Sequence, residues 1–341
     1  MGVTRQIKVG ILTAPHIEFE QRANTFILKN VRIGIGFHWD RYEDQEFAGT
    51  LTIRNNADGT QTAINTIDLE DYLCSVISSE MSANRPIELL KAHAVISRSW
   101  AIRAMQKPNH EGFDVCADDH CQRYEGLRRM SERAVEAVRA TAGQVLLYND
   151  EICDCRYYKC CGGKTEIWRT CWEDIDVPYI QSVQCDYCKS PSPKILRLVL
   201  NDYDQETKDF RDWKVTYKDE ELNEIIRTKS GIDFGEIIDL IPLHRGASGR
   251  IDQLRIVGTK HTEVIGKELK IRYWLSRSCL YSSWFEVAHE NGVWTLSGHG
   301  WGHGAGLCQI GAAVMATEGK TYEEILTYYY PGTRLNEKMR K

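Results

Sequence analysis

A segment near the C-terminus, GHGWGHGAGLCQIGA at residues 298–312, places two histidines and a tryptophan among six glycines. Imidazoles exchange protons and form hydrogen bonds, and an indole ring stacks on flat apolar faces. Glycine lets the backbone adopt positive φ and approach other groups closely. The segment therefore predicts a shaped binding loop in which His299, Trp301 and His303 contact a ligand. The simpler interpretation is a glycine-rich turn that holds a core tryptophan.

Glu80 is the carboxylate best placed for proton transfer, because we expect it at the C-terminal end of a helix, before the turn that leads to Pro86. The negative end of the helix dipole disfavours its charged form, and the neighbours Val76 and Ile77 add desolvation. Both effects favour a protonated acid, as a general acid requires. The alternative is a solvated surface glutamate. Arg98, in the next helix, approaches this junction if the helices pack antiparallel; otherwise it makes a surface ion pair.

A second set of reactive residues follows that helix: His110, Cys116, His120 and Cys121. Two imidazoles and two thiolates suit tetrahedral zinc, and a complete set of nitrogen and sulfur ligands leaves no position open for substrate. The pattern predicts a structural zinc ion. The alternative is a chance grouping of buried thiols with a surface histidine.

The chain contains twelve cysteines, and most of them lie between residues 116 and 188. Cys185-x2-Cys188, with Cys160, Cys161 or Cys171 nearby, is compatible with a second metal site or with a disulfide. The first twelve residues contain no apolar segment of the kind that secretory signal peptides carry, so no signal peptide is visible. In that setting, clustered cysteines favour metal ligation or free thiols over a disulfide framework.

The elements that must position these residues follow from periodicity and capping signals. Alternation at Val31, Ile33, Ile35 and Phe37 predicts a strand. Asn149-Asp150 and Asn291-Gly292 predict hairpin turns, and the second hairpin leads directly into the glycine-rich loop. We expect helices over residues 69–77 with Asp68 as N-cap, 86–105, 131–141 with Ser131 as cap, from 309, and 321–329. Strands and helices are mixed without βαβ alternation, so the predicted class is α+β, with mixed antiparallel sheets and packed helices.

Composition limits the partners. The chain has 341 residues and a net charge of −5, which gives no electrostatic reason to expect nucleic acid as a partner. No apolar run is long enough to span a bilayer.

Two long motifs resemble one family. Residues 67–105, IDLEDYLCSVISSEMSANRPIELLKAHAVISRSWAIRAM, are similar to the signature of the stage II sporulation protein D family (SpoIID/LytB). Residues 298–335, GHGWGHGAGLCQIGAAVMATEGKTYEEILTYYYPGTRL, resemble the C-terminal motif of that family. Between them, residues 158–165 and 178–183 occupy the places of two shorter family elements. Ser82, Cys161 and Gln181 depart from the usual family residues.

The resemblance implies a single catalytic domain over residues 64–335, joined by a β-rich segment over residues 1–63. It implies a lytic transglycosylase that cleaves peptidoglycan strands between N-acetylmuramic acid and N-acetylglucosamine and leaves 1,6-anhydro ends. Glu80 would be the general acid and base, and Arg98 would hold the sugar or tune Glu80. The residues that would bind substrate are Tyr179, His299, Trp301, His303 and Gln309.

The resemblance also bears on cofactor, partner and location. Some family members carry a similar His/Cys cluster with zinc. The substrate implies an extracytoplasmic location, in the periplasm or cell envelope. Other relatives are amidase enhancers, so the alternative is a non-catalytic glycan-binding module that stimulates a cell-wall amidase. A zinc-dependent amidase is a further alternative, but it needs an open metal position, which four protein ligands do not leave.

Overall fold

The computed structural model describes residues 5–35, 40–80, 85–107, 109–118, 120–189, 192–193, 195–196 and 211–336. Phe37 and Ser82 lie outside these ranges. Strands and helices are mixed, most strand pairs are antiparallel, and the predicted α+β class is confirmed. No helix among the described residues is long and apolar enough to cross a membrane.

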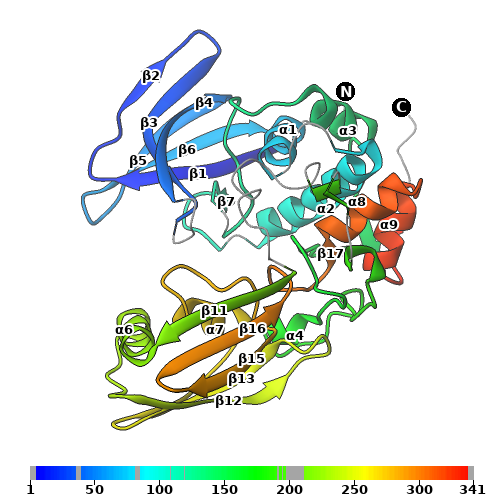
Figure 1. Cartoon of the computed structure of the whole chain (residues 1–341). Helices are drawn as coiled ribbons and strands as arrows, with labels where there is room; N and C mark the ends of the chain where they lie inside the picture. The colour runs from blue at the N-terminus through cyan, green and yellow to red at the C-terminus, as the bar shows by residue number, and fades with distance from the viewer. Residues whose placement is uncertain are drawn as a thin grey trace.

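The N-terminal part forms two small sheets, drawn at the upper left of Figure 1. One sheet has the strand order β5-β6-β1-β7 and the other the order β2-β3-β4. Their bounds are β1 Gln6–Ala14, β2 Phe19–Gln21, β3 Thr25–Ile33, β4 Arg41–Ala48, β5 Thr50–Asn55, β6 Gln61–Asp68 and β7 Val115–Cys116. Because β7 pairs in parallel with β1, the loop after the second helix returns to the sheet edge.

Helices cover one side of this region and form most of the right of Figure 1. The Asp68 carboxylate accepts a hydrogen bond from the Glu70 amide at the start of α1, and the Ser131 hydroxyl accepts one from the Ala134 amide in α3, as the capping signals predict. The bounds are α1 Leu69–Glu80, α2 Ile87–Gln106, α3 Glu132–Ala140, α8 Gln309–Thr317 and α9 Tyr322–Tyr329. These helices and both N-terminal sheets share one hydrophobic core.

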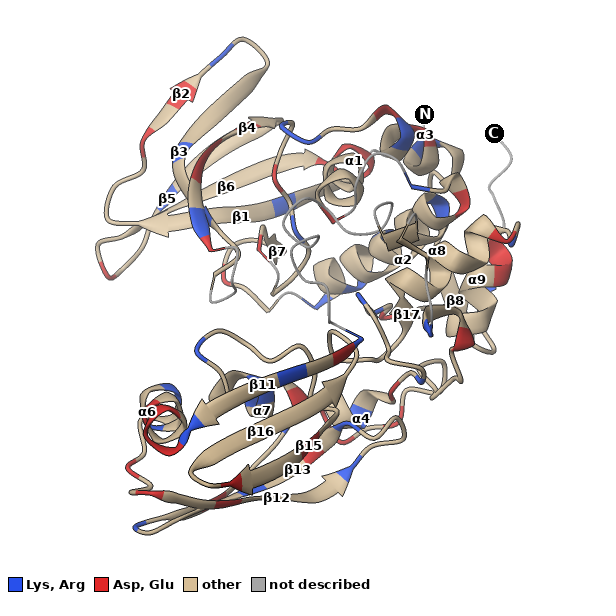
Figure 2. Cartoon of the chain, in the orientation of Figure 1, with Lys and Arg blue, Asp and Glu red and all other residues tan. Residues whose placement is uncertain are grey.

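A separate core, around Trp213, Phe234, Phe285 and Trp294, lies in the lower half of Figure 1. Its elements are β11 Asp212–Lys218, α6 Asp219–Ser230, β12 Ile237–Arg245, β13 Ile251–Gly258, β14 Thr262–Ile265, α7 Glu268–Trp274, β15 Phe285–Glu290 and β16 Val293–His299. The predicted Asn291-Gly292 hairpin is confirmed as the β15–β16 turn, with both residues at positive φ. Figure 2 shows acidic and basic residues mixed along the elements of both halves.

The chain between the two cores is mostly irregular. The predicted hairpin turn at Asn149-Asp150 joins the short strands β8 Leu146–Tyr148 and β9 Glu151–Ile152, and β18 Arg334–Leu335 completes their sheet. Further along the chain, the strand β10, Tyr157–Tyr158, pairs in parallel with β17, Leu307–Cys308. This pairing places the glycine-rich loop beside β10. Two short helices, α4 Trp168–Cys171 and η1 Asp186–Cys188, complete this region.

Candidate active site

A cavity of about 1070 Å³ lies where these segments meet. Its lining comes from the end of α1, the loop around β7, β10, α4, α7 and the glycine-rich loop. Glu80 and His303, which are far apart in sequence, both line it. Its size exceeds what a small metabolite needs and suits a chain of several sugar rings.

The Glu80 carboxyl, at the last residue of α1, accepts hydrogen bonds from two donors in the described part of the chain. Its Oε1 accepts a hydrogen bond from the Tyr157 hydroxyl at 3.1 Å and another from the Arg123 backbone amide at 3.1 Å. The carboxyl is therefore fixed from two opposite segments, β10 and the loop after β7. Proton transfer requires such positioning, since a displaced acid loses contact with the reacting oxygen.

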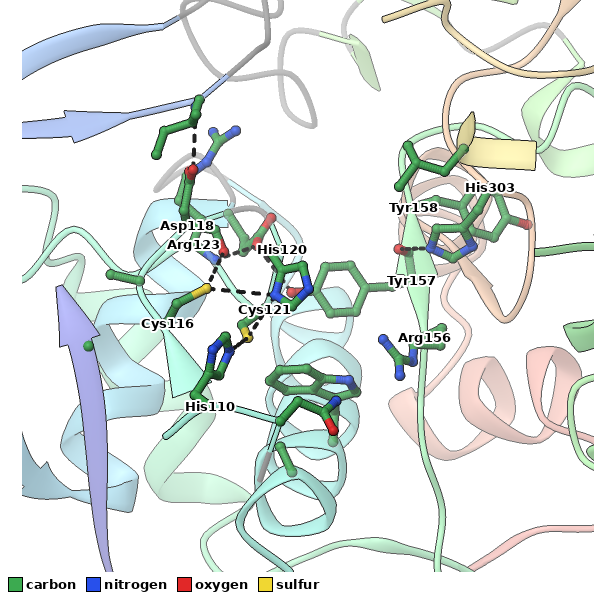
Figure 3. A pocket seen from close by; sticks show the side chains of 18 of the residues that line it. His110, Cys116, Asp118, His120, Cys121, Arg123, Arg156, Tyr157, Tyr158 and His303 are labelled. Atoms are coloured by element: carbon green, nitrogen blue, oxygen red, sulfur yellow. Dashed lines mark hydrogen bonds between the residues drawn. The ribbon is translucent and has the colours of Figure 1, made fainter. Parts of the chain in front are cut away.

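Tyr157 connects Glu80 to the glycine-rich loop. Figure 3 shows its ring reaching from the β10 side of the cavity toward His120. The ring of His93 on α2 meets it at 4.3 Å between centroids. The Tyr157 carbonyl accepts a hydrogen bond from His303 Nε2 at 3.0 Å. Tyr157 therefore links the two predicted parts of the site, the Glu80 carboxyl and the glycine-rich loop.

His303 differs from the expected ligand-binding imidazole. Its Nε2 donates to the Tyr157 carbonyl, and its Nδ1 accepts from the Ala305 amide at 3.1 Å. Burial, together with the nearby Arg156, lowers the pKa of His303 well below its ordinary value. The ring is therefore neutral with both nitrogens engaged, and it orders the loop rather than exchanging protons.

Arg156 lies among indole rings on the β10 side of the cavity. Its guanidinium is 4.8 Å from the centroid of Trp172 and 5.3 Å from that of Trp168. The Asp154 carboxylate pairs with it at 2.7 Å. Trp172 is only half-buried and lines the cavity, so it presents the kind of aromatic face on which sugar rings stack.

The remaining predicted binding residues divide into two groups. Trp301 and Gln309 line the cavity but are buried, with 8% and 2% of their surfaces exposed. Trp301 meets Tyr281 edge-on at 5.4 Å, and the Gln309 amide lies 3.1 Å from His93 Nε2. Packing therefore engages both of them inside the protein.

His299 and Tyr179 are not among the residues that line the cavity. His299 pairs with Asp212 at 2.7 Å on the exposed end of β16. The Tyr179 hydroxyl accepts a hydrogen bond from the Asp154 amide at 2.9 Å. Because Asp154 pairs with Arg156, Tyr179 supports the indole cluster from behind.

The expected approach of Arg98 to Glu80 is not what the structure shows. Arg98 is 1% exposed and forms two hydrogen bonds, of 2.8 and 2.7 Å, with the Glu70 carboxylate. Glu70 is in the first turn of α1, whereas Glu80 ends that helix, so about 15 Å of helix separates them. The remaining Arg98 hydrogen bonds reach the Ala94 carbonyl within α2 and the carbonyls of Val138 and Gln144 outside it. Arg98 therefore joins α1, α2 and α3.

The predicted His/Cys cluster comes together at the cavity edge (Figure 3). One donor atom from each of His110, Cys116, His120 and Cys121 lies within 4.8 Å of all the others. His110 Nε2 is 3.2 Å and His120 Nδ1 is 3.5 Å from the Cys121 sulfur. A tetrahedral zinc ion holds such donors about 3.3–3.8 Å apart, so the residues fit it.

The two thiols share one hydrogen bond, which together with His120 lowers the pKa of Cys116 and raises the pKa of Cys121 well above its ordinary value. Cys116 is therefore the thiol that ionises first. Arg123, whose amide holds Glu80, follows Cys121 by two residues. The cluster is thus directly connected to the position of the carboxyl.

Several site residues were not singled out in the sequence, chiefly Tyr157, Arg123, Arg156 and Trp172. Tyr157 directly precedes residues 158–165, which occupy the place of a family element. This neighbouring position is the one feature of the sequence that could have pointed to Tyr157 as a site residue. Arg123 contributes its backbone amide, so its side-chain type carries no information.

Two family models match parts of this chain. The family model described as "Stage II sporulation protein" matches residues 57–148, which include Glu80 and the His/Cys cluster. A model described as a domain of unknown function matches residues 166–306, which include Trp172 and His303.

Curated relatives cover most of the chain. Stage II sporulation protein D of Bacillus subtilis (strain 168) is 29% identical over 290 residues, which are 81% of this chain and 76% of that protein. Stage II sporulation protein D of Bacillus amyloliquefaciens is 26% identical over 291 residues, 81% of this chain and 76% of that protein. The amidase enhancer of Bacillus subtilis (strain 168) is 26% identical over 295 residues, 77% of this chain and 40% of that protein.

Proposed function

Because the chain contains a domain of the stage II sporulation protein D family, we propose that it is a lytic transglycosylase of bacterial cell-wall peptidoglycan. The observation that carries the proposal is the Glu80 carboxyl, oriented by Tyr157 and Arg123 in a cavity large enough for a glycan strand. The substrate is a glycan strand without stem peptides, cut between N-acetylmuramic acid and N-acetylglucosamine.

Glu80 performs both proton transfers. As an acid it protonates the glycosidic oxygen, the bond to C1 of the muramic acid breaks, and N-acetylglucosamine leaves with a free hydroxyl. The resulting carboxylate then takes the proton of the C6 hydroxyl, whose oxygen closes on C1. The product carries a 1,6-anhydro ring and no water is consumed. Tyr157 and the Arg123 amide keep the carboxyl in place between the two steps.

The half-buried Trp172 ring is the expected platform for a sugar face, with Arg156 beside it for a polar substituent. Trp301, His303 and Gln309 act from behind this surface by fixing β10 and the loop. His299, Tyr179 and Arg98 contribute to structure and do not touch the glycan.

His110, Cys116, His120 and Cys121 would hold a structural zinc ion, with all four positions filled by protein. When bound, the ion supplies rigidity to the loop that carries Arg123, and through the Arg123 amide it fixes Glu80. The substrate lies outside the cytoplasmic membrane, so we place the protein in the periplasm or cell envelope.

The test is digestion of purified glycan strands without stem peptides, with mass spectrometry of the products. Anhydro ends are lighter than hydrolysed ends by one water molecule. Glu80→Gln is nearly isosteric and should abolish their formation, because general acid–base catalysis supplies about 10²–10⁴-fold. Activity within a few-fold of wild type would refute the assignment of Glu80.

Glu173 provides a matched control, since it is a second carboxylate that lines the cavity. A hydrolase needs two carboxylates and adds water to its product. We expect Glu173→Gln to retain anhydro products. Loss of activity in this variant, together with hydrated ends in the wild type, would favour a hydrolase instead.

The similarity to an amidase enhancer supports the second candidate, a module that binds glycan and stimulates a cell-wall amidase. This function does not need the Glu80 proton. Stimulation of an amidase by the Glu80→Gln variant, with no anhydro products from the wild type, would favour the enhancer.

A further inference from the structure

Four buried cysteines from three separate segments meet between β10 and α8. They are Cys161 after β10, Cys185 and Cys188 at η1, and Cys308 at the end of β17. Their sulfur atoms all lie within 4.8 Å of one another. The sequence left open whether the Cys185-x2-Cys188 pair forms a metal site or a disulfide, and which cysteines join it. The structure brings Cys161 and Cys308 to the pair, and Cys160 lies next to the group.

The sulfurs of this group are packed closely against one another. The Cys161 and Cys188 sulfurs are 3.0 Å apart, closer than the ~3.5–4.0 Å at which non-bonded heavy atoms usually meet. The distance is also well above the ~2.05 Å of a disulfide. A disulfide joins two sulfurs only, and the group has four.

Hydrogen-bond donors surround the sulfurs, as they do around thiolates. The amides of Cys161 and Gly311 each lie 3.4 Å from the Cys308 sulfur, and the Gly163 amide lies 3.4 Å from the Cys161 sulfur. The Tyr329 hydroxyl is 3.2 Å from the Cys185 sulfur. Donors of this kind orient metal-bound thiolates and stabilise their charge. Cys308 also caps the N-terminus of α8, where negative charge is favoured.

We propose that Cys161, Cys185, Cys188 and Cys308 bind a second zinc ion, in a tetrahedral site of four thiolates. A zinc ion about 2.3 Å from each sulfur holds the sulfurs about 3.8 Å apart. The four sulfurs lie within 4.8 Å of one another, and the Cys161–Cys188 pair, at 3.0 Å, opens by about 0.8 Å to take the ion. An iron–sulfur cluster spreads its four thiolates over two or four irons and needs wider spacing. On binding, four thiols release their protons to solvent and the site carries two negative charges. The buried Arg250, which donates to the Cys161 carbonyl, offsets part of this charge.

The site would clamp one wall of the cavity. Cys308 directly precedes Gln309, and Cys161 lies four residues after Tyr157, so the ion joins the glycine-rich loop to β10. Four protein ligands leave no position for substrate, so its role is structural. The His/Cys cluster lies on the Glu80 side of the cavity, and the four-cysteine site supports the His303 side.

The test uses the full chain purified without added metal, with zinc measured by elemental analysis and native mass spectrometry. We expect two zinc ions per chain, one for each group of ligands. Cobalt replacement should give absorption bands of a site with four thiolates, on top of those of a site with two. One zinc ion in the wild type, with only the two-thiolate spectrum, would refute the proposal. A mass that shows a disulfide between these cysteines would refute it as well.

Variants assign the ligands. Cys185→Ser/Cys188→Ser should retain one zinc ion and lose the four-thiolate spectrum. His110→Ala/Cys121→Ser should retain one zinc ion with that spectrum. The Cys185→Ser/Cys188→Ser result tests the four-cysteine site separately from the zinc of the proposed function, because its readout is zinc content and not activity.

Cys160→Ala is the matched control, because this buried thiol contacts Cys188 and Cys308 but lies outside the group of four. It should retain both ions. Loss of the second ion in this variant, with its retention in Cys161→Ala, would overturn the assignment of ligands. Circular dichroism checks that each variant is folded. If a variant is not folded, the number of zinc ions bound by the wild-type chain decides whether the second site exists.

Discussion

Replacing Arg98 with methionine tests whether a residue at a family motif position acts on substrate or holds helices together. Methionine keeps the length and packing of the side chain but removes its charge and donors. Two carbonyl partners, on Val138 and Gln144, lose a hydrogen bond each, at about 1 kcal/mol apiece. The ion pair with Glu70, whose side chain is 34% exposed, adds about 1 kcal/mol after solvent screening.

The expected loss in the free energy of unfolding is therefore about 3 kcal/mol. In a chain of this size, about 2 °C accompanies each kcal/mol, so the Tm should fall by about 6 °C. Calorimetry measures this directly. Glu70→Gln is the matched control, since it removes the charge but keeps a hydrogen-bond acceptor, and its Tm should fall less.

Activity distinguishes the two roles. At a temperature where wild type and Arg98→Met are both folded, we expect them to form anhydro products at rates within a few-fold of each other. A catalytic Arg98 would instead cost about 10²-fold or more and leave the Tm nearly unchanged. That result would refute the structural role derived from its hydrogen bonds.

Four further predictions concern other parts of the site. Tyr157→Phe should lower the rate about 10–100-fold and the Tm by no more than about 6 °C, since it removes one hydrogen bond to the carboxyl that ionises in the reaction, worth about 1.5–3 kcal/mol. Removing zinc from the His/Cys cluster with a chelator should lower both Tm and activity, and added zinc should restore both; a metal-free protein of unchanged Tm would contradict this. Trp301→Ala should cost about 3–5 kcal/mol of stability, measured by denaturant unfolding, whereas Trp172→Ala should weaken glycan binding, measured by calorimetric titration, at little cost in stability. Burial lowers the pKa of His93 and His303, so below about pH 6.5 the unfolded chain binds protons that the folded chain does not. The free energy of unfolding, measured in urea, should therefore fall by about 1.4 kcal/mol for each of these histidines per unit decrease in pH. His303→Gln should reduce that slope.

Local signals predicted the elements that carry the site. Asp68, Pro86 and Ser131 mark helix starts in the structure, and Asn291-Gly292 forms its hairpin. These signals act within a few residues, so the sequence alone contains them. The His/Cys ligands are also close in sequence, within residues 110–121, and the structure brings all four together.

Longer-range features were not predictable in this way. Glu80 is held by Tyr157, 77 residues away, and nothing in the spacing of the two residues indicates their contact. Arg98 was expected near Glu80 because the two helices are neighbours, yet its guanidinium points to the opposite end of α1. The second core, between residues 213 and 296, lies outside both family motifs and was not anticipated as a separate unit.

The glycine-rich loop was expected to bring its backbone close to a ligand, but protein atoms occupy the space beside its glycines. A Cβ on Gly304 would lie 2.5 Å from the Arg250 guanidinium carbon, and one on Gly306 would lie 2.1 Å from the Arg156 carbonyl oxygen, both at positive φ. A side chain at either position would push the loop off β10 and move the His303 ring that holds the Tyr157 carbonyl. Because the Tyr157 hydroxyl donates a hydrogen bond to Glu80, the tight packing of the loop helps to position the proposed acid through Tyr157. The glycines therefore fix the wall of the cavity behind the proposed acid, and the proposed four-cysteine site at the end of the same loop would fix that wall further.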